Sequence, residues 1–246
     1  MSVYPVTSRL PQVDTPAMVE VDRLMMEDYQ INLFQMMENA GRCLARLTRD
    51  VALNGSAEGK RVVVLAGGGG NGGGALTAAR RLASWGADVT VGLGQKPDAM
   101  APVPLHQLQI LEKMERITVG RPEDAGAADA VLDGLVGYSL SGPPYGRITE
   151  LIEWANTCPA PTFSLDVPSG FDATRARVLE PAVRAAATLT IALPKAGLQD
   201  ELTADIRGAL YCCDISVPPE LYLQLPEPLE VGAIFAQDDI VRVDVA

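Results

Sequence analysis

The stretch RVVVLAGGGGNGGGALTAARRLASWGADVTVGLG, residues 61–94, decides the fold of this chain. It reads as a short apolar β-branched run, a turn saturated with glycine, an alanine-rich helical segment and a second apolar run, the pattern of a strand–loop–helix–strand unit. Because glycine has no Cβ, the turn can bring backbone N–H groups and the start of the helix close to an anion. The sequence therefore predicts a phosphate-bearing ligand at Gly67–Gly74.

Two common nucleotide-binding motifs do not fit this turn. A P-loop needs Gly-Lys-Ser/Thr, and here Gly73 is followed by Gly74 and Ala75. The spacing G-x-G-x-x-G is present, but a run so dense in glycine satisfies almost any glycine spacing. The second strand also ends near 92–95 without the carboxylate that holds the ribose in the usual dinucleotide fold. An ATPase and an ordinary NAD dehydrogenase are disfavoured, and the structural alternative is a flexible connection that binds nothing.

The rest of the chain continues the alternation of strands and helices. This alternation predicts an α/β protein: a three-layer αβα Rossmann-like fold in one domain, 1–246, with a mostly parallel central sheet. Two amphipathic helices precede the sheet, at 16–30 and 33–49, with Thr15 as the first N-cap and methionine stripes that we expect in the core. The other predicted helices lie near 75–85, 104–114, 146–156 and 198–204, and the strands near 61–66, 88–93, 116–119, 129–136, 162–166, 186–193 and 208–215.

Charge and cysteine usage limit the class of partner. The formal net charge of −11 makes a surface that repels phosphate backbones, so nucleic-acid and anionic-membrane binding are not expected. Cys43, Cys158, Cys212 and Cys213 show no C-x-x-C spacing and His106 is the only histidine, so no zinc site is predicted. We expect the adjacent pair, Cys212 and Cys213, to be buried free thiols. With neither a signal peptide nor a membrane-spanning pattern in the sequence, we expect a soluble cytoplasmic protein.

Three polar clusters follow predicted strands: Gly67–Gly74, 133–143 and 166–170. Since ligands bind at the carboxyl ends of parallel strands, these clusters should meet in one crevice. Asp166, between an apolar run and Pro-Ser-Gly, is favoured for a ligand or catalytic role over a turn or cap. For Asp133 and Ser169 the sequence leaves open both a ligand or catalytic role and a role in a turn or cap. We expect His106 to be an ordinary surface residue.

Six motifs follow one another in order: MMENAG at 36–41, VLAGGGGNGGGALTAARRL at 64–82, DGLVGYSLSG at 133–142, DVPSG at 166–170, TLTIALPKAG at 188–197, and GALYCCDISVP from residue 208. In this order they resemble the YjeF N-terminal domain family, whose characterised enzymes are NAD(P)H-hydrate epimerases. The resemblance covers residues 17 to about 222. The domain core is therefore predicted at about 15–225, with the tail 226–246 outside the resemblance.

The resemblance implies a reaction and a site. The reaction interconverts the R and S forms of NADHX or NADPHX, which carry water at C6 of the nicotinamide ring, and Asp166 is the implied acid/base. A potassium ion is implied at Asn71, Asp133 and Ser169, and a homodimer is implied through the N-terminal helices. The implied substrate-binding residues are Gly70, Asn71, Gly72, Gly73, Gly74, Gly137, Tyr138, Ser139, Leu140, Ser141, Gly142, Pro143 and Asp166.

The glycine turn departs from the family pattern. Gly70 and Gly74 stand where the family has asparagine and aspartate. Removing such groups leaves substrate atoms unpaired on desolvation, at about 1–3 kcal/mol each. Two alternatives to an epimerase therefore stay open: a nucleotide-binding or protein-interaction module on the same fold without catalysis, and a related enzyme with a shifted substrate.

Overall fold

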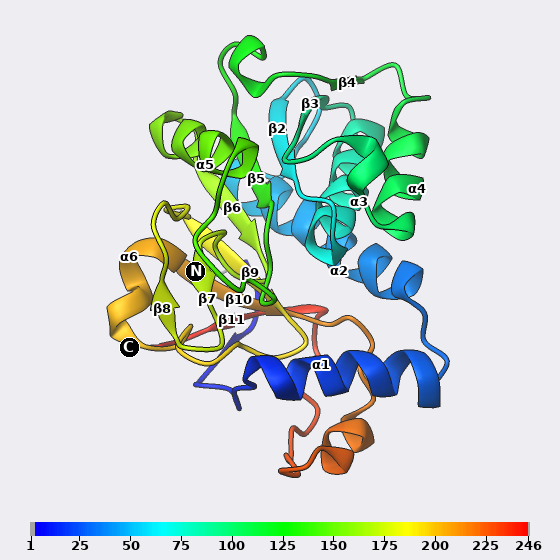
Figure 1. Cartoon of the computed structure of the whole chain (residues 1–246), viewed down its shortest axis with the longest axis vertical. Helices are drawn as coiled ribbons and strands as arrows, with labels where there is room; N and C mark the ends of the chain where they lie inside the picture. Colours follow the sequence, from blue (N-terminus) through cyan, green and yellow to red (C-terminus); the bar gives the residue numbers. More distant parts are fainter. Residues whose placement is uncertain (1–2, 246) are drawn as a thin grey trace.

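The computed structural model describes residues 3–245, which form a nine-stranded sheet with helices on both faces (Figure 1). The sheet strands are, in chain order, β1 (Val6–Thr7), β2 (Arg61–Ala66), β3 (Asp88–Leu93), β4 (Ile117–Val119), β5 (Ala130–Gly134), β6 (Thr162–Leu165), β9 (Ala187–Ile191), β10 (Ala209–Cys213) and β11 (Ile240–Val243). Their spatial order is β1-β11-β10-β9-β6-β5-β2-β3-β4. Every neighbouring pair is parallel except β10 and β11. The predicted fold class is thus confirmed.

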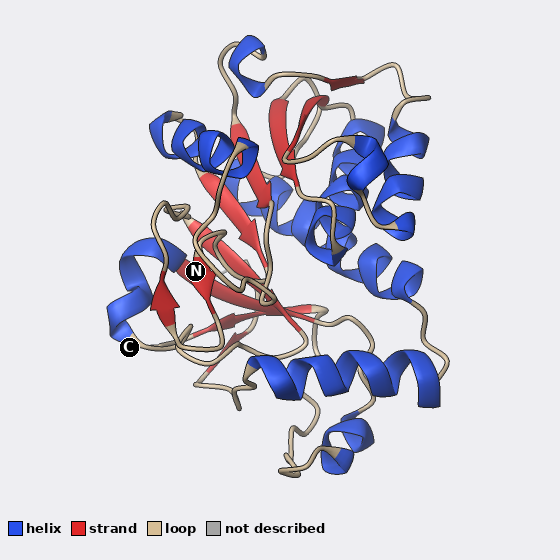
Figure 2. Cartoon of the chain, in the orientation of Figure 1, coloured by secondary structure: helices blue, strands red, loops and turns tan. Residues whose placement is uncertain are grey.

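Helices connect most of the parallel strands (Figure 2). They are α1 (Thr15–Arg23), α2 (Leu33–Leu47), α3 (Gly70–Ser84), α4 (Pro102–Leu111), α5 (Arg147–Thr157) and α6 (Ala204–Arg207). A π-helical turn extends each of the first two, at Leu24–Asp28 and Thr48–Ala52. Short 3-10 turns lie at Pro97–Ala99, Pro122–Asp124, Glu201–Thr203 and Pro219–Gln224, and a small antiparallel pair is formed by β7 (Phe171–Asp172) and β8 (Arg177–Val178).

The sheet is covered unequally on its two faces (Figure 1). Successive residues of β2 point to opposite faces. Val62 and Val64 join the large core beneath α2, α3 and α4, whereas Val63 and Leu65 join a smaller cluster beneath α5. A parallel sheet of this kind is buried on both faces, which explains the nearly continuous apolar composition of its strands.

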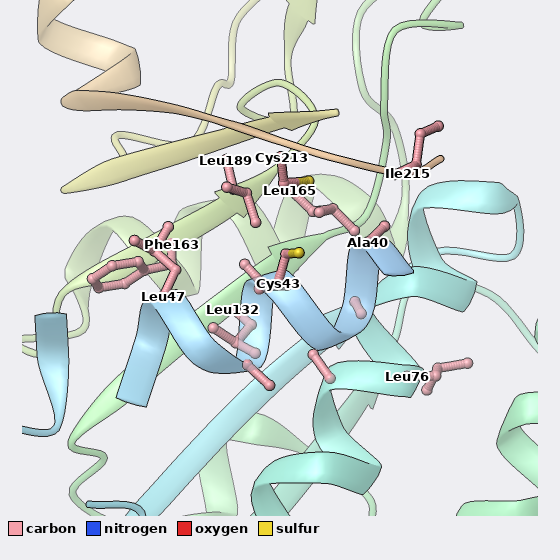
Figure 3. Packing of buried hydrophobic residues seen from close by; sticks show 14 of the residues in the cluster. Ala40, Cys43, Leu47, Leu76, Leu132, Phe163, Leu165, Leu189, Cys213 and Ile215 are labelled. Atoms are coloured by element: carbon pink, nitrogen blue, oxygen red, sulfur yellow. The ribbon is translucent and has the colours of Figure 1, made fainter. Parts of the chain in front are cut away.

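Helix α2 is central to the larger core (Figure 3). It starts with a capping box, in which the Asn32 side chain accepts from the backbone N–H of Gln35 and the Gln35 side chain accepts from that of Asn32. Its buried face carries Ala40, Cys43 and Leu47, which pack over the strands. The two methionines of this helix, Met36 and Met37, are buried as predicted, and both also border the cavity described below.

Several predicted boundaries were wrong. Asp14 rather than Thr15 caps α1, because the Asp14 carboxylate accepts from the backbone N–H of Ala17. Helix α3 begins at Gly70 rather than Ala75, so half of the predicted loop is helix. The helix predicted at 198–204 is a 3-10 turn followed by the short α6.

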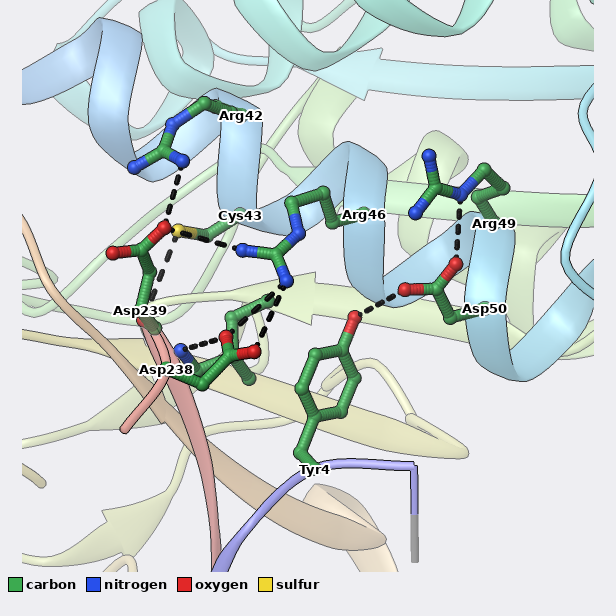
Figure 4. A network of polar contacts seen from close by, with 9 residues as sticks. Tyr4, Arg42, Cys43, Arg46, Arg49, Asp50, Asp238 and Asp239 are labelled. Carbon is green, nitrogen blue, oxygen red and sulfur yellow. Dashed lines mark hydrogen bonds and ion pairs between the residues drawn. The ribbon is translucent and has the colours of Figure 1, made fainter. Parts of the chain in front are cut away.

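The tail beyond residue 225 contributes β11, inserted between β10 and β1. Figure 4 shows how it is fixed to α2. Arg42 pairs with Asp239 at 2.7 Å, and Arg46 reaches both Asp238 and Asp239 at 3.2 Å. From the other end of the chain, the Tyr4 hydroxyl donates to Asp50 at 2.7 Å. Both ends of the described chain are therefore held by side chains of α2 and of the π-helical turn that extends it.

All four cysteines are free, and Cys43, Cys212 and Cys213 are buried. The prediction of buried thiols at the adjacent pair is confirmed. His106 is exposed and packs edge-on against Phe34, with ring centroids 5.2 Å apart, which agrees with the prediction of an ordinary surface residue.

Tight backbone packing explains two glycines of the segment that joins β2 to α3 and forms the first turn of that helix. A Cβ on Gly72 would lie 1.8 Å from the backbone oxygen of Gly67, and a Cβ on Gly67 would lie 1.9 Å from that of Leu135. On Gly70, the first residue of α3, a Cβ would meet nothing within 4 Å. Gly67 and Gly72 are therefore required for close approach of the chain, and Gly70 is not.

This difference predicts that two neighbouring substitutions have different effects on stability. Gly72→Ala should lower the free energy of unfolding by at least about 1–3 kcal/mol, because the methyl group meets backbone that cannot rotate away. Gly70→Ala should stay within about 1 kcal/mol of the wild type, since alanine favours the helix and occupies open space. Urea unfolding followed by circular dichroism measures both. Equal losses in the two variants would contradict this account of the turn.

Candidate functional site

A cavity of about 470 Å³ lies at the carboxyl ends of the central strands, next to the start of α3. Its size is within the range of small-molecule sites. The predicted convergence of the three polar clusters is found here, because residues following β2, β5 and β6 all line this cavity. Of the predicted substrate-binding residues, those that line it are Gly70, Asn71, Gly137, Tyr138, Ser139 and Asp166.

The other predicted substrate-binding residues lie elsewhere. Gly72, Gly73 and Gly74 are buried within α3, where a Cβ on Gly73 would meet the Met37 side chain and one on Gly74 would meet Leu165. These glycines permit α3 to pack against its neighbours. Residues 140–143, namely Leu140, Ser141, Gly142 and Pro143, continue the loop beyond Ser139 and are not among the residues lining the cavity.

Part of the cavity wall comes from the two N-terminal helices. Asp22 and Met26 contribute from α1 and its π-helical turn, and Met36 and Met37 contribute from α2. The sequence predicts that the methionine stripes lie in the core. Met36 and Met37 are buried and also line the cavity, whereas Met26 lines it and is 41% exposed. A flexible thioether at the cavity wall can adapt to an apolar part of a ligand.

Asp166 lies at the floor of the cavity in a buried ion pair. Its Oδ1 is 2.6 Å from Nζ of Lys195, and both side chains are at most 2% exposed. Its Oδ2 accepts from the backbone N–H of Tyr138 at 2.8 Å. Asp166 has φ of +67°, a conformation that is uncommon for a residue with a Cβ and that occurs preferentially at functional sites.

Lys195 is fixed from several sides. Its Nζ also donates to the backbone oxygen of Ile191, the last residue of β9, at 2.8 Å, and lies 5.8 Å from the ring centroid of Tyr138. Lys195 is not among the site residues predicted from the sequence. The signal that could have indicated it is a single charge shortly after an apolar strand, at the same ends of the parallel strands as Asp166.

Tyr138 joins the loop after β5 to α1. Its hydroxyl donates to Asp22 Oδ2 at 2.6 Å, and its backbone oxygen accepts from Thr15 Oγ1 at 3.4 Å. Burial raises the pKa of Asp22, and the negative charge of Asp166 adds to this, while the Tyr138 hydrogen bond and Lys195 lower it. Burial, together with the carboxylate of Asp22, likewise raises the pKa of Tyr138. The site thus holds two carboxylates in different surroundings around one lysine.

Asp133 is fully buried and hydrogen-bonded by four donors. Its oxygens accept from Ser169 Oγ at 2.6 Å, from Ser164 Oγ at 2.8 Å and from the backbone N–H groups of Ser169 and Leu135 at 2.9 and 3.2 Å. Within residues 3–245, no lysine, arginine or histidine pairs with it. Burial raises the pKa of Asp133, and these hydrogen bonds lower it.

Asn71, in the first turn of α3, is partly buried, and both polar atoms of its amide are buried without a hydrogen-bond partner in the described part of the chain. A Cβ on Gly137 would lie 3.3 Å from the Asn71 side chain, so the amide lies against the cavity loop. A hard cation prefers carboxylate, amide, hydroxyl and backbone oxygens. Asn71, Asp133 and Ser169 carry oxygen atoms of these kinds, so their chemistry fits a monovalent cation. Among residues 3–245, no group of three or more His, Cys, Asp and Glu side chains could hold a metal ion.

The start of α3 gives the cavity an anion-binding wall. The N-cap is Gly69 in an extended conformation, and the N–H groups of the first turn have no acceptor within the helix. Gly68, Gly69 and Gly70 line the cavity, so these N–H groups and the helix dipole are available to a phosphate. The predicted phosphate position after β2 therefore borders the same cavity as Asp166.

Comparison with known proteins gives the chain its family. Residues 33–197 match the family described as YjeF-related protein N-terminus. The chain belongs to this family. The resemblance seen in the sequence motifs is confirmed, and the match covers the glycine turn, the Asp133 and Asp166 segments and Lys195.

Individual relatives extend over most of the chain. An NAD(P)H-hydrate epimerase of Dehalogenimonas lykanthroporepellens is 46% identical over 85% of this chain and 84% of its own length. One of Rhodopirellula baltica is 34% identical over 88% of each chain. A bifunctional NAD(P)H-hydrate repair enzyme of Salinibacter ruber is 36% identical over 85% of this chain but only 41% of its own length.

A solved structure shows the same fold. The crystal structure of the yeast protein Ynu0 superposes with a TM-score of 0.78, covering 95% of this chain and all of that one, at 23% identity. In the part of the chain from residue 3 to 245, no helix is both long and apolar enough to cross a membrane.

Proposed function

We propose that this protein is an NAD(P)H-hydrate epimerase, which interconverts the R and S forms of NADHX and NADPHX. The observation that carries the proposal is the buried Asp166–Lys195 pair at the floor of a cavity whose wall is the start of α3. Relatives with the epimerase name, 46% and 34% identical over most of the chain, support it. The glycines at 70 and 74 change the family pattern without closing the cavity.

The cavity offers each part of such a substrate a chemically suitable surface. The phosphates would bind the N–H groups at the start of α3, and the apolar rings would contact Met26, Met36 and Met37. The nicotinamide end would then face Asp166. Gln95 also lines the cavity and could hydrogen-bond to ribose or amide groups, a function that the glycine at 70 cannot provide.

Asp166 is proposed to move the proton. C6 carries a hydroxyl group and is bonded to the ring nitrogen, so its inversion can proceed by ring opening: the hydroxyl oxygen loses its proton and forms C=O while the C6–N1 bond breaks and the nitrogen takes up a proton. The nitrogen then adds to the other face of the carbonyl, and the proton returns to the oxygen. A carboxylate within hydrogen-bond reach can accept and return that proton. Lys195 balances the charge of Asp166 and, with the Tyr138 N–H, holds its orientation, so the acid/base is positioned before substrate binds.

Asp166→Asn should reduce epimerisation of NADPHX by about 10²–10⁴-fold, the usual contribution of a positioned proton-transfer group. Chromatographic separation of the two epimers, starting from one of them, measures the rate, and a thermal melt verifies folding. Asp124→Asn, at an exposed position, is the matched control and should retain full activity. A wild-type protein that binds nicotinamide nucleotides but epimerises neither hydrate would contradict the epimerase and support a binding module. A protein that neither binds these nucleotides nor epimerises either hydrate would support an enzyme with a shifted substrate.

We further propose a potassium ion at Asn71, Asp133 and Ser169. Its support is the fully buried Asp133 carboxylate, which has no cationic partner in the described residues, and the Asn71 amide in the cavity wall, whose oxygen lacks a donor there. Buried charges are normally paired or bound to a cation. The ion would balance the charge of Asp133 and hold the loop that carries Gly137 and Tyr138 against α3.

Potassium chloride should therefore raise the melting temperature above that in tetramethylammonium chloride at equal ionic strength. The stabilisation is about 2.7 kcal/mol at a hundred times the dissociation constant. Asn71→Ala should weaken the apparent affinity for potassium at least about 10-fold, whereas Gln109→Ala, at a surface amide, should not change it. Identical melting in both salts would exclude the ion.

We also propose that the protein is a cytoplasmic homodimer that uses the outer surface of its N-terminal helices. Val19 and Phe34 are exposed there although both are large and apolar. An interface between two copies would cover them, burying about 1,600 Å² or more in total. Free buried thiols suit a reducing compartment.

Sedimentation velocity at micromolar concentration should give twice the chain mass of 26.1 kDa. Val19→Glu or Phe34→Glu should shift the protein to the monomer, because each would bury a charge in the interface. Leu202→Glu, at an apolar position that is 96% exposed on another part of the chain, is the matched control and should stay dimeric. A wild type that sediments only as monomer would contradict the assembly.

A further inference from the structure

A second cavity lies at the opposite edge of the sheet. Its volume is about 460 Å³, and it lies between α6, the start of β10 and the end of β11. The candidate active site is at the carboxyl ends of β9 and β10, whereas Arg207 and Gly208 directly precede β10. Figure 1 shows α6 at the far side of the sheet from α3. The two cavities are therefore separate.

Arg207 is the unusual residue of this cavity. It is only 5% exposed, and its Nη1 donates to the backbone oxygen of Gly208 at 2.7 Å. Its Nε is buried with no hydrogen-bond partner in the described part of the chain. No Asp or Glu between residues 3 and 245 forms an ion pair with it, although most arginines of this acidic chain are paired. A guanidinium remains charged at neutral pH, so among residues 3–245 this buried charge has no anionic partner.

The neighbouring charges increase the imbalance. Burial lowers the pKa of Arg207 and the positive charge of Arg9 lowers it further. Arg242, from the middle of β11, lines the same cavity from its exposed strand face. Asp244 also lines it, but the groups that shift the pKa of Arg207 are its own burial and Arg9.

We propose that this cavity is a second ligand site, which binds the phosphate or carboxylate group of a small molecule between Arg207 and Arg242. A planar guanidinium presents a fork of N–H groups that matches two oxygens of such an anion. Binding supplies the missing negative charge and an acceptor for the buried guanidinium. The site is independent of the epimerase reaction and has its own ligand chemistry.

Binding of the anion should be measurable by thermal melts and by titration calorimetry. Inorganic phosphate and succinate, each compared with chloride at equal ionic strength, test the two oxyanion sources. At least one of them should raise the melting temperature of the wild type along a saturating curve. Excluded salts stabilise all variants alike, so only a difference between variants counts as site binding.

Arg207→Met and Arg242→Gln should each weaken that binding at least 10-fold, whereas Arg121→Gln, a charge-matched surface control, should not alter it. Without anion, Arg207→Met should melt at or above the wild-type temperature, because it removes an uncompensated buried charge. Asp166→Asn should leave the binding unchanged, which separates this site from the candidate active site.

Two results would overturn the proposal: absence of a saturating response to either anion, or a response of equal size in wild type, Arg242→Gln and Arg121→Gln. The second result would place the anion elsewhere, for example at the start of α3. Arg242 is exposed, so its variant keeps the test decisive even where Arg207→Met does not fold.

Discussion

The ion pair between Asp166 and Lys195 is the constraint on which the candidate site depends. Each partner is taken almost completely out of water, and the attraction of two charges at 2.6 Å must offset that loss of hydration. Removing one partner of such a pair usually costs about 3–5 kcal/mol, because the other charge stays buried. The pair therefore holds the chain after β6 and the chain after β9 at fixed positions beneath the cavity.

The surrounding loops are arranged around that pair. Tyr138 donates its backbone N–H to Asp166, places its ring near Lys195 and sends its hydroxyl to Asp22 on α1. One residue thereby connects the loop after β5, the buried pair and the N-terminal helix. The cavity wall contributed by α1 is thus linked to Asp166 by hydrogen bonds of Tyr138 rather than by apolar packing alone.

Much of this architecture could be predicted from the sequence because its signals are local. The β-branched runs of β2 and β3 and the polar clusters after β2, β5 and β6 follow one another at short range, and the parallel topology places them at one edge. Lys195 and Asp22 were missed because their partners, Asp166 and Tyr138, lie in distant segments of the chain. Asp22 also stands among other charges on an amphipathic helix, where nothing in the sequence distinguishes it from a surface residue. Strand β11 was missed because four residues carry little periodicity, and its place depends on pairing with β10 and on the ion pairs to α2.

From the sequence alone, the two glycines that depart from the family pattern cannot be distinguished. In the structure they have different surroundings. Position 70 lines the cavity, where a Cβ would meet nothing within 4 Å, so a glycine there leaves the packing unchanged and removes a side chain from the cavity wall. At position 74, a Cβ would lie 2.7 Å from Cδ2 of Leu165 and 3.7 Å from Ala40, in the seam between α2, α3 and β6. A carboxylate at position 74 would need a different packing of that seam. Gly74 therefore belongs with the local helix packing of this chain, and Gly70 is the departure that changes the wall of the cavity.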